Sequence, residues 1–179
     1  MDSIAIEKAC RFCPRCGHQA EVDGCVPFRC SNCGFANFYG PVAAVGGLVI
    51  NEQRELLLVR RAREPGKGKW GLPGGFVDRD ETIEQALSRE VLEETNLRVS
   101  HARYLTSFPN LYEYGGVVAP VIDLFYVCQV ADQGEIRLAD GELDSFSWLT
   151  PTQRHLQEMA FASNRQAIEK WIREEMSPW

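Results

Sequence analysis

The sequence predicts an α/β fold in which helices flank a mixed sheet, with a small cysteine-rich module in front of it. Several runs rich in Val, Ile, Phe and Tyr have the composition and length of strands. These runs are residues 42–50, 55–60, 99–108, 117–130 and 143–149. A helical pattern at 82–95 interrupts them, and two C-x2-C-G segments precede them all.

The helix at 82–95 has both a start signal and a buried stripe. Thr82 and Gln85 stand three residues apart, the spacing of a capping box. Its apolar residues recur at helical spacing and are Ile83, Ala86, Leu87 and Val91. A second helix is expected to open at Ser163, with Gln166 completing another capping box.

Glu90, Glu93 and Glu94 follow the i, i+3, i+4 pattern, so their side chains leave one face of the first helix. Like charges at this spacing destabilise a helix unless something neutralises them. Carboxylate oxygens are the ligands that Mg²⁺ and Mn²⁺ prefer, so a divalent cation is one solution. A solvated acidic face is the alternative.

The residues around this acidic face fit a metal site. Gly74 and Gly75 let the backbone approach the helix, where the Gly75 carbonyl could complete the ligand set. Arg89 lies one turn before Glu93, where it either orients a carboxylate or forms a structural salt bridge. Glu81 is expected at the helix start, away from the cluster.

The N-terminal repeat predicts a structural zinc site. Its ligands would be Cys13, Cys16, Cys30 and Cys33, two C-x2-C pairs with metal-knuckle spacing. Cys10, Cys25 and His18 lie close enough to substitute, with Cys10 and Cys13 as the main rival pair. Tyr39-Gly40-Pro41 is typical of a domain boundary. We therefore expect a zinc ribbon at 1–40 and a larger domain at 41–179.

Gly75, Glu81, Arg89-Glu90 and Glu93-Glu94 together resemble the signature of the Nudix hydrolases, G-x5-E-x7-R-E-U-x-E-E-x-G-U, where U is a bulky aliphatic residue. Asn96 departs from the glycine of that pattern, and Asn is the second choice for the left-handed turn that follows a helix. The resemblance implies an α/β/α sandwich and metal-dependent hydrolysis of a pyrophosphate, with Mg²⁺ or Mn²⁺ held by Gly75, Glu90, Glu93 and Glu94. The resemblance also implies catalytic roles for Glu90, Glu93, Glu94 and Arg89.

A further carboxylate is expected from a loop outside the motif, because many Nudix relatives supply a general base or metal ligand there. Glu142 is favoured over Asp140 because its side chain reaches farther; an exposed acidic turn is the alternative. Arg60 and Arg61, at the end of a strand, are candidates for substrate phosphates. Exposed solubilising charge is the alternative for both.

The ribbon makes the chain similar to the NADH pyrophosphatase branch, which carries S-Q-P-W-P-F-P-x-S after its helix. Residues 107–112, SFPNLY, keep little more than a serine and a proline of that segment. ADP-ribose, NADH, FAD or a similar dinucleotide are therefore all candidate substrates. A nucleotide-sensing regulator without hydrolysis and an RNA-cap hydrolase are the competing functions.

Composition restricts the partners. The net charge of −6 argues against nucleic acid, and the ribbon has no basic excess. The longest apolar stretch, Val42 to Ile50, is too short to span a membrane. Cysteines at metal-knuckle spacing, which indicates reduced thiols, and the lack of a recognisable targeting segment favour the cytoplasm. The expected partner is a small nucleotide, and a homodimer is compatible with the sequence.

Overall fold

The computed structural model describes residues 3–131 and 134–176 and divides into two compact units. The first contains the described residues up to Val42 together with Leu111–Val121. The second contains Ala43–Asn110 and the described residues from Ile122 onward. The boundary expected between residues 40 and 41 stays a prediction.

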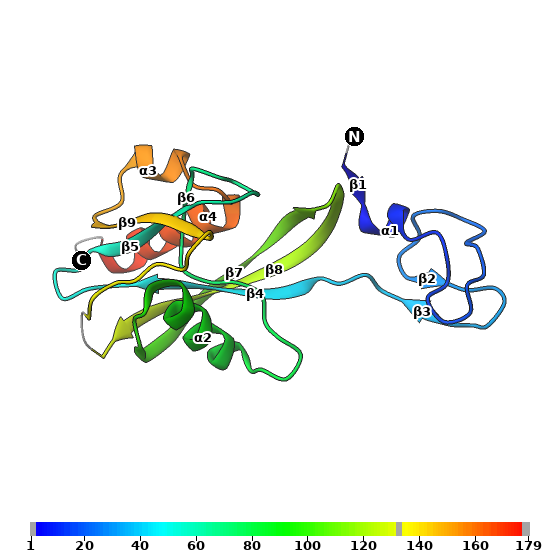
Figure 1. Cartoon of the computed structure of the whole chain (residues 1–179), viewed down its shortest axis with the longest axis horizontal. Coiled ribbons are helices and arrows are strands. Elements are labelled where there is room, and N and C mark those ends of the chain that lie inside the picture. The colour runs from blue at the N-terminus through cyan, green and yellow to red at the C-terminus, as the bar shows by residue number, and fades with distance from the viewer. Residues whose placement is uncertain (1–2, 132–133, 177–179) are drawn as a thin grey trace. The chain divides into compact units, whose positions relative to one another are not determined.

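The elements follow the order expected from the sequence (Figure 1). Short elements come first: β1 Ile4–Ala5, α1 Ile6–Ala9, β2 Phe28–Arg29 and β3 Ala36–Asn37. The longer strands and first long helix are β4 Val42–Val49, β5 Leu56–Arg61, β6 Trp70–Gly71, α2 Ile83–Thr95, β7 Val99–Tyr114, β8 Val117–Val130 and β9 Leu143–Leu149. The chain then forms α3 Gln153–Gln157, α4 Ala162–Trp171 and a π-helical turn at Ile172–Met176. All five expected strands are confirmed.

Strand β7 is longer than expected, because it continues past residue 108 to Tyr114. The two residues that follow it, Gly115 and Gly116, have φ of 59° and 79°. Two consecutive positive φ values suit a tight hairpin turn, and glycine adopts them without steric cost. The turn therefore lets β7 and β8 pair out to the tip of the hairpin.

Besides a two-stranded sheet of β2 and β3, the described residues form two larger sheets. In one, β8 pairs with β1, β4 and β7; in the other, β5 lies between β6 and β9. The β1–β8 pair is parallel, whereas β6 and β9 both run antiparallel to β5. The expected mixed α/β architecture is thus confirmed.

Alternate residues of the strands of the second unit face two separate cores. Leu57 and Val59 of β5 join a cluster with Leu87 of α2, whereas Leu56 and Leu58 join a cluster that contains Ile168 of α4. This alternation follows from the two-residue period of a strand. Helices α2 and α4 consequently cover opposite faces of the strands, the α/β/α sandwich that the sequence predicted (Figure 1).

Glycines in β4 let both layers approach closely. A Cβ on Gly47 would lie 3.2 Å from Cγ2 of Val91 in α2. On the opposite face, a Cβ on Gly46 would lie 2.7 Å from Cε1 of Phe125. The paired glycines therefore set the packing distances on both sides of this strand.

The second helix begins without the expected capping box. Its N-cap is Phe161, with no side-chain cap hydrogen bond, and Ser163 lies inside the first turn. The Ser163 hydroxyl instead donates to Oδ2 of Asp123 at 2.5 Å, and Ser163 is almost fully buried. The capping prediction was wrong because a buried carboxylate on β8 takes this hydroxyl. Among the described helices, none is long and apolar enough to cross a membrane.

We expect Gly46→Ala to destabilise the second unit by about 1–3 kcal/mol, because the new methyl group overlaps the Phe125 ring. Urea unfolding followed by tryptophan fluorescence measures this, since all four tryptophans lie beyond residue 43. Phe125→Leu should cost less in the Gly46→Ala background than in the wild type. Equal costs in both backgrounds would contradict the overlap.

Candidate functional site

A glycine-rich loop runs beside β4 and forms one wall of the candidate site. Three backbone hydrogen bonds attach it: Gly47 N to Pro73 O at 2.8 Å, Val45 N to Gly75 O at 2.9 Å, and Val77 N to Ala43 O at 3.1 Å. These bonds continue the hydrogen-bonding pattern of the sheet edge, so the loop is held rigidly.

Gly74 and Gly75 occupy positions where no side chain fits. A Cβ on Gly74, whose φ is 151°, would lie 2.1 Å from the carbonyl oxygen of Val45. A Cβ on Gly75 would lie 2.5 Å from Oε1 of Glu90. The loop backbone therefore touches the acidic face of α2, as the sequence predicted. The Gly75 carbonyl accepts from Val45 and keeps a second lone pair.

Helix α2 has the start and end that its sequence specifies. The Thr82 side chain accepts from the N–H of Gln85, and the Gln85 side chain accepts from the N–H of Thr82, which confirms the capping box. Asn96 ends the helix in the left-handed conformation, with φ of 63°. These two boundaries fix which helical face carries the glutamates.

Arg89 joins the carboxylates of the helix into one network. Its Nε and Nη2 donate to the two oxygens of Glu81 at 2.7 and 2.8 Å. Its Nη1 donates to Glu90 at 2.7 Å and to Glu93 at 3.2 Å, and Nη2 also reaches the Phe76 carbonyl at 3.1 Å. Hydrogen bonds to Glu81 and then Glu90 raise the Arg89 pKa, so the guanidinium is permanently charged.

Glu81 is a site residue whose contact the sequence reasoning missed. We expected it away from the cluster, but it forms the bidentate pair with Arg89, whose hydrogen bond lowers its pKa. The two residues are eight positions apart in the sequence, a spacing at which neither helical nor strand periodicity predicts contact. Glu81 precedes the helix, where the loop turns its side chain back toward Arg89.

Glu94 is the most deeply buried carboxylate of the cluster. Only 8% of its surface is exposed, and its Oε2 accepts from the N–H of Gly74 at 2.9 Å. Burial raises its pKa from an ordinary 4.5 to about 8, because the Gly74 hydrogen bond does not offset desolvation, and Glu90 and Glu142 add repulsion. A carboxylate so placed requires a proton or a cation.

Glu90 shares this environment, whereas Glu93 lies at its edge. Burial is the largest cause of the raised pKa of Glu90, and Arg89 opposes it. The Glu93 side chain is 59% exposed and pairs with Arg89. Oxygen donors from Glu90, Glu94 and the Gly75 backbone suit a hard divalent cation, and the unmet charge on Glu94 is what such an ion would neutralise.

Glu142 lies within electrostatic range of the cluster, since its charge contributes to the raised pKa values of Glu90 and Glu94. Its Oε1 is 2.7 Å from Nη2 of Arg63. The preceding segment is attached to the end of α2, because Ala139 N donates to the Glu94 carbonyl at 3.2 Å. Asp140 is exposed and contributes to neither shift.

Arg60 and Arg61 both bond to their own loop. Nε of Arg60 donates to Gly68 O at 2.8 Å, and Nε of Arg61 donates to Pro65 O at 2.7 Å. Their guanidinium groups also lie over aromatic rings, those of Trp70 and Phe161 respectively. Burial is the largest influence on the pKa of Glu94 and raises it. Of the two arginines, Arg61 acts against this effect and lowers the pKa slightly.

The four predicted cysteines form a compact cluster in the first unit. Their sulfur atoms all lie within 4.8 Å of one another, with Cys13 to Cys33 at 3.7 Å and Cys16 to Cys30 at 3.6 Å. A tetrahedral ion with metal–sulfur bonds of about 2.3 Å separates its sulfurs by roughly 3.8 Å. These distances fit a bound metal and are far longer than a disulfide of about 2.05 Å.

The sequence repeat is also a repeat of backbone geometry. Gly17 N donates to the Cys13 carbonyl and Gly34 N donates to the Cys30 carbonyl, both at 2.9 Å. The two glycines have φ of 73° and 70°, the left-handed region that glycine enters without strain. Each knuckle thereby wraps its backbone around a pair of sulfurs.

The sulfurs differ in how readily they ionise. Hydrogen bonds, first from the His18 backbone and then from the Asn32 side chain, lower the pKa of Cys16 to about 6. The Phe35 backbone favours a thiolate at Cys33, yet burial and the other cysteines raise its pKa to about 12. Four sulfurs this close become thiolates together only when a cation neutralises them.

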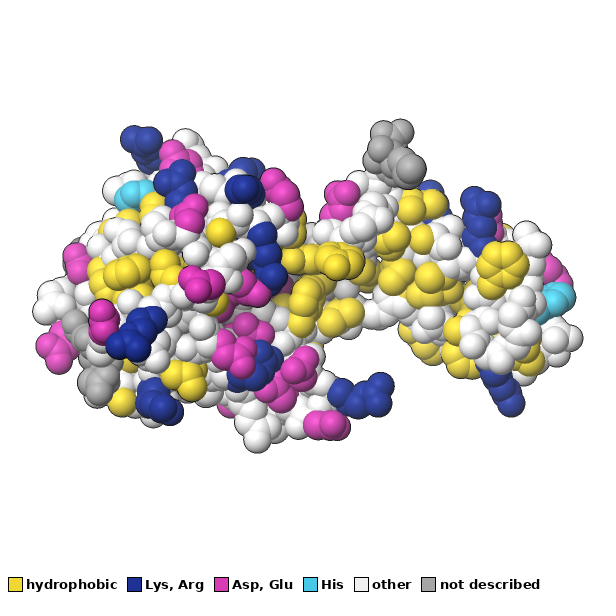
Figure 2. Space-filling view, viewed as in Figure 1, with side chains coloured by type: hydrophobic (Ala, Val, Ile, Leu, Met, Phe, Trp, Pro, Cys, Tyr) yellow, Lys and Arg dark blue, Asp and Glu magenta, His cyan; other side chains and the backbone are white. Residues whose placement is uncertain are grey.

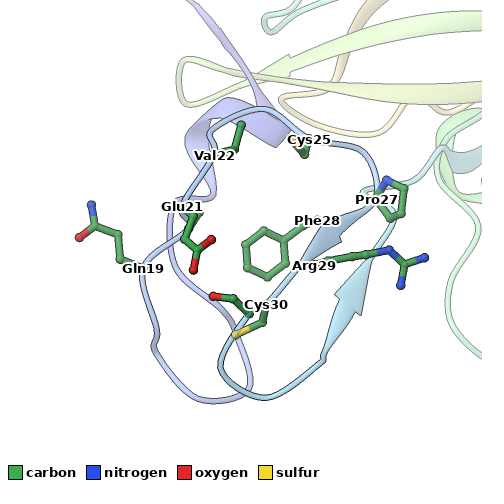
Figure 3. Close-up of a pocket in the computed structure, with 10 residues that line it drawn as sticks. Gln19, Glu21, Val22, Cys25, Pro27, Phe28, Arg29 and Cys30 are labelled. Carbon is green, nitrogen blue, oxygen red and sulfur yellow. The ribbon is translucent and has the colours of Figure 1, made fainter.

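The rival ligands Cys10, Cys25 and His18 stand outside this cluster. Cys25 instead lines a pocket of about 260 Å³ in the same unit, whose wall includes the Phe28 ring (Figure 3). Glu21 and Arg29 also contribute to that wall. The pocket is therefore a feature of the first unit, and its wall contains none of the glutamates of the candidate metal site.

The comparisons with known proteins agree with this geometry. The family model described as the NUDIX domain matches residues 40–171. The chain is 33% identical over 149 residues to a protein of Actinobacillus succinogenes named NAD-capped RNA hydrolase NudC, an alignment covering 79% of this chain and 53% of that protein. The chain thus spans about half the length of the curated relatives it matches, and it belongs to the Nudix family.

Solved structures share the fold. The NUDIX domain of Shewanella oneidensis NrtR, crystallised with ADP ribose, superimposes with a TM-score of 0.62 and 27% identity, covering 78% of this chain and 91% of that one. A NUDIX hydrolase of Nitrosomonas europaea covers 93% of this chain and 92% of its own with a TM-score of 0.67; at 23% identity it supports the fold alone.

Without added divalent cation, Glu94 should make the stability of the second unit depend on pH. Its pKa is higher in the folded state, so its stabilising contribution is complete below about pH 4.5 and is lost as the pH rises through about 8. The Glu94→Gln variant lacks this titration. Above pH 8 the variant should therefore gain up to about 5 kcal/mol relative to wild type.

Urea unfolding of both proteins across this pH range, followed by tryptophan fluorescence, measures the difference. Mg²⁺ or Mn²⁺ should stabilise the wild type and leave Glu94→Gln nearly unchanged. A constant difference between the two proteins from acid to alkaline pH would show that the Glu94 carboxyl has an ordinary pKa.

Metal analysis tests the cysteine cluster. We expect one zinc ion per chain in the wild type and none in Cys30→Ser, because removing one buried ligand opens the site and unfolds the module around it. Cys25→Ser is the matched control, since Cys25 is exposed and outside the cluster, and it should keep its zinc. Zinc retained by Cys30→Ser, or absent from the wild type, would refute the site.

Proposed function

We propose that this chain is a metal-dependent Nudix pyrophosphohydrolase that cleaves a nucleoside diphosphate linked to another group. The observation that carries this proposal is the buried Glu94 carboxylate beside Glu90, on a helix that packs against a glycine loop. Burying carboxylates together is costly, and this cost is typical of a site that binds a cation.

Glu90, Glu94 and the Gly75 carbonyl are the proposed ligands of Mg²⁺ or Mn²⁺, with Glu93 at the exposed edge. When bound, such an ion neutralises the pyrophosphate and acidifies a water molecule. Arg89 keeps the glutamates oriented through its hydrogen bonds to Glu90 and Glu93. The Gly74 N–H fixes one oxygen of Glu94 and leaves the other oxygen available to a cation.

Glu142 is the proposed general base. It lies in electrostatic range of Glu90 and Glu94, it is only partly buried, and its loop is attached to the end of the catalytic helix. A base in this position accepts a proton from the attacking water and passes it to solvent. The comparison with Asp140, which is exposed and acts on neither glutamate, supports the choice.

For the substrate we propose a dinucleotide or a related compound such as ADP-ribose, NADH or FAD. Support comes from the Shewanella structure, which contains ADP ribose, and from the relative named for NAD-capped RNA. Removal of an NAD-type cap from RNA is the second candidate, because the same pyrophosphate bond would be cleaved. On the face seen in Figure 2, Lys and Arg are scattered among Asp and Glu and form no continuous basic area.

The cysteine module is proposed to be a structural zinc ribbon with Cys13, Cys16, Cys30 and Cys33 as ligands. Zn²⁺ suits four thiolates, whereas Mg²⁺ and Mn²⁺ prefer oxygen. A reducing compartment such as the cytoplasm suits free cysteines. Nucleotide binding without hydrolysis remains the functional alternative, and the intact acidic positions Glu90, Glu93 and Glu94 argue for hydrolysis.

The decisive experiment is hydrolysis of a panel containing ADP-ribose, NADH, FAD and NAD-capped RNA with Mg²⁺ or Mn²⁺. We expect at least one substrate to be cleaved at its pyrophosphate. Glu90→Gln and Glu94→Gln should each lower kcat by about a hundredfold or more, because each removes a negative charge that holds the ion. Glu84→Gln, an exposed change on the same helix, is the control.

Binding of a nucleotide by wild-type protein without turnover would favour the sensor instead. Preference for the capped RNA over free NAD would favour the second candidate.

A further inference from the structure

A basic segment is connected with the acidic site, because its Ala62 N–H donates to the Glu142 carbonyl and the charge of Arg61 acts on Glu94. Residues 60–69, RRAREPGKGK, contain five of the 19 Lys and Arg residues of the chain and one of its 25 Asp and Glu residues. The segment begins at the end of β5 and returns through β6. Cationic side chains concentrated here contrast with the net charge of −6 and are unexplained by the catalytic glutamates alone.

Two of the five cations shape the segment itself. Arg60 and Arg61 hold the carbonyls of Gly68 and Pro65, and Glu64 accepts from the N–H of Gly66 at 2.7 Å. These contacts close the loop on itself and make it a fixed platform. The phosphate-binding role that the sequence suggested for Arg60 and Arg61 would compete with this use of their guanidinium groups.

Arg63 is used differently. Among the described residues Arg63 pairs with Glu142, whose Oε1 lies 2.7 Å from its Nη2. The backbone beside it is fixed, because Ala62 N donates to the Glu142 carbonyl at 2.8 Å. Arg63 thus reaches from this loop to Glu142, a carboxylate whose charge contributes to the raised pKa values of Glu90 and Glu94.

The ion pair is weak enough to be exchanged. The side chains of Arg63 and Glu142 are 59% and 38% exposed, and pairs of this kind contribute only about 0–1 kcal/mol. A phosphate oxyanion carries charge on several oxygens and accepts a bidentate guanidinium, which makes it the stronger partner. A substrate phosphate can therefore displace Glu142 from Arg63 at little cost.

We propose that Arg63 binds a phosphate of the substrate pyrophosphate and that Glu142 holds its guanidinium in position until the substrate arrives. The exchange of partners also releases the Glu142 carboxylate to act as the base. This inference rests on the proposed function, because it assigns a residue to the same nucleotide site.

Calorimetric titration with the methylene-bridged analogue of ADP-ribose, at saturating Mg²⁺, tests the assignment because the analogue cannot be hydrolysed. Arg63→Met should weaken its binding about tenfold or more, since a charge-assisted hydrogen bond is lost. Arg63→Lys should recover part of the affinity, because lysine retains the charge without the bidentate geometry. With the substrate itself, Arg63→Met should chiefly raise KM.

Arg137→Met is the matched control, since Arg137 forms an exposed ion pair with Glu135 and should bind like the wild type. Arg63→Met should still weaken binding when introduced into Glu142→Gln, because the contact is made with the ligand. If Glu142→Gln weakens binding as much as Arg63→Met and the double variant is no worse, the pair is merely structural and the proposal fails.

The role of Arg63 and the proposed hydrolase activity can be disproved separately. Wild-type protein that hydrolyses ADP-ribose while Arg63→Met binds the analogue normally would overturn only the role of Arg63. Wild-type protein that neither binds the analogue nor cleaves any dinucleotide would overturn the proposed function and this inference together.

Discussion

The site depends on one guanidinium. Arg89 satisfies Glu81 in the loop before the helix, Glu90 and Glu93 on the helix, and the Phe76 carbonyl in the glycine loop. Lysine could not replace it, because a point charge lacks the planar fork that pairs with both oxygens of Glu81. Because Arg89 bonds to both the glycine loop and the helix, it fixes the positions of the glutamates relative to one another and to the loop.

The burial of Glu94 shows that this arrangement of glutamates lowers the stability of the fold. A glutamine there would satisfy the Gly74 N–H equally well through its carbonyl oxygen and would avoid burying a charge. The chain instead keeps a carboxylate at 8% exposure, beside Glu90 and near Glu142. A local conflict with stability is characteristic of sites where function, and not folding, selects the residue.

Much of the fold and part of the site followed from local sequence. The Thr82 cap, the left-handed turn at Asn96 and the cysteine repeat depend on neighbours within a few residues, which periodicity and turn chemistry describe. Contacts between distant segments were not predictable in this way. The Ser163 hydroxyl meets Asp123 forty positions away, and the pair of Arg63 with Glu142 requires the register of β5 against β9.

Backbone hydrogen bonds also connect the segment before Glu142 with the end of α2. The last carbonyls of an α-helix lack partners within the helix. In α2 those of Glu94 and Thr95 accept from Ala139 and Arg137 at 3.2 and 3.1 Å, so the segment that leads to Glu142 completes the end of the helix. A helix that moved would carry this segment with it. The separation between the Glu142 backbone and α2 is thus fixed by backbone hydrogen bonds, so the proposed exchange of partners requires only the Glu142 side chain to move.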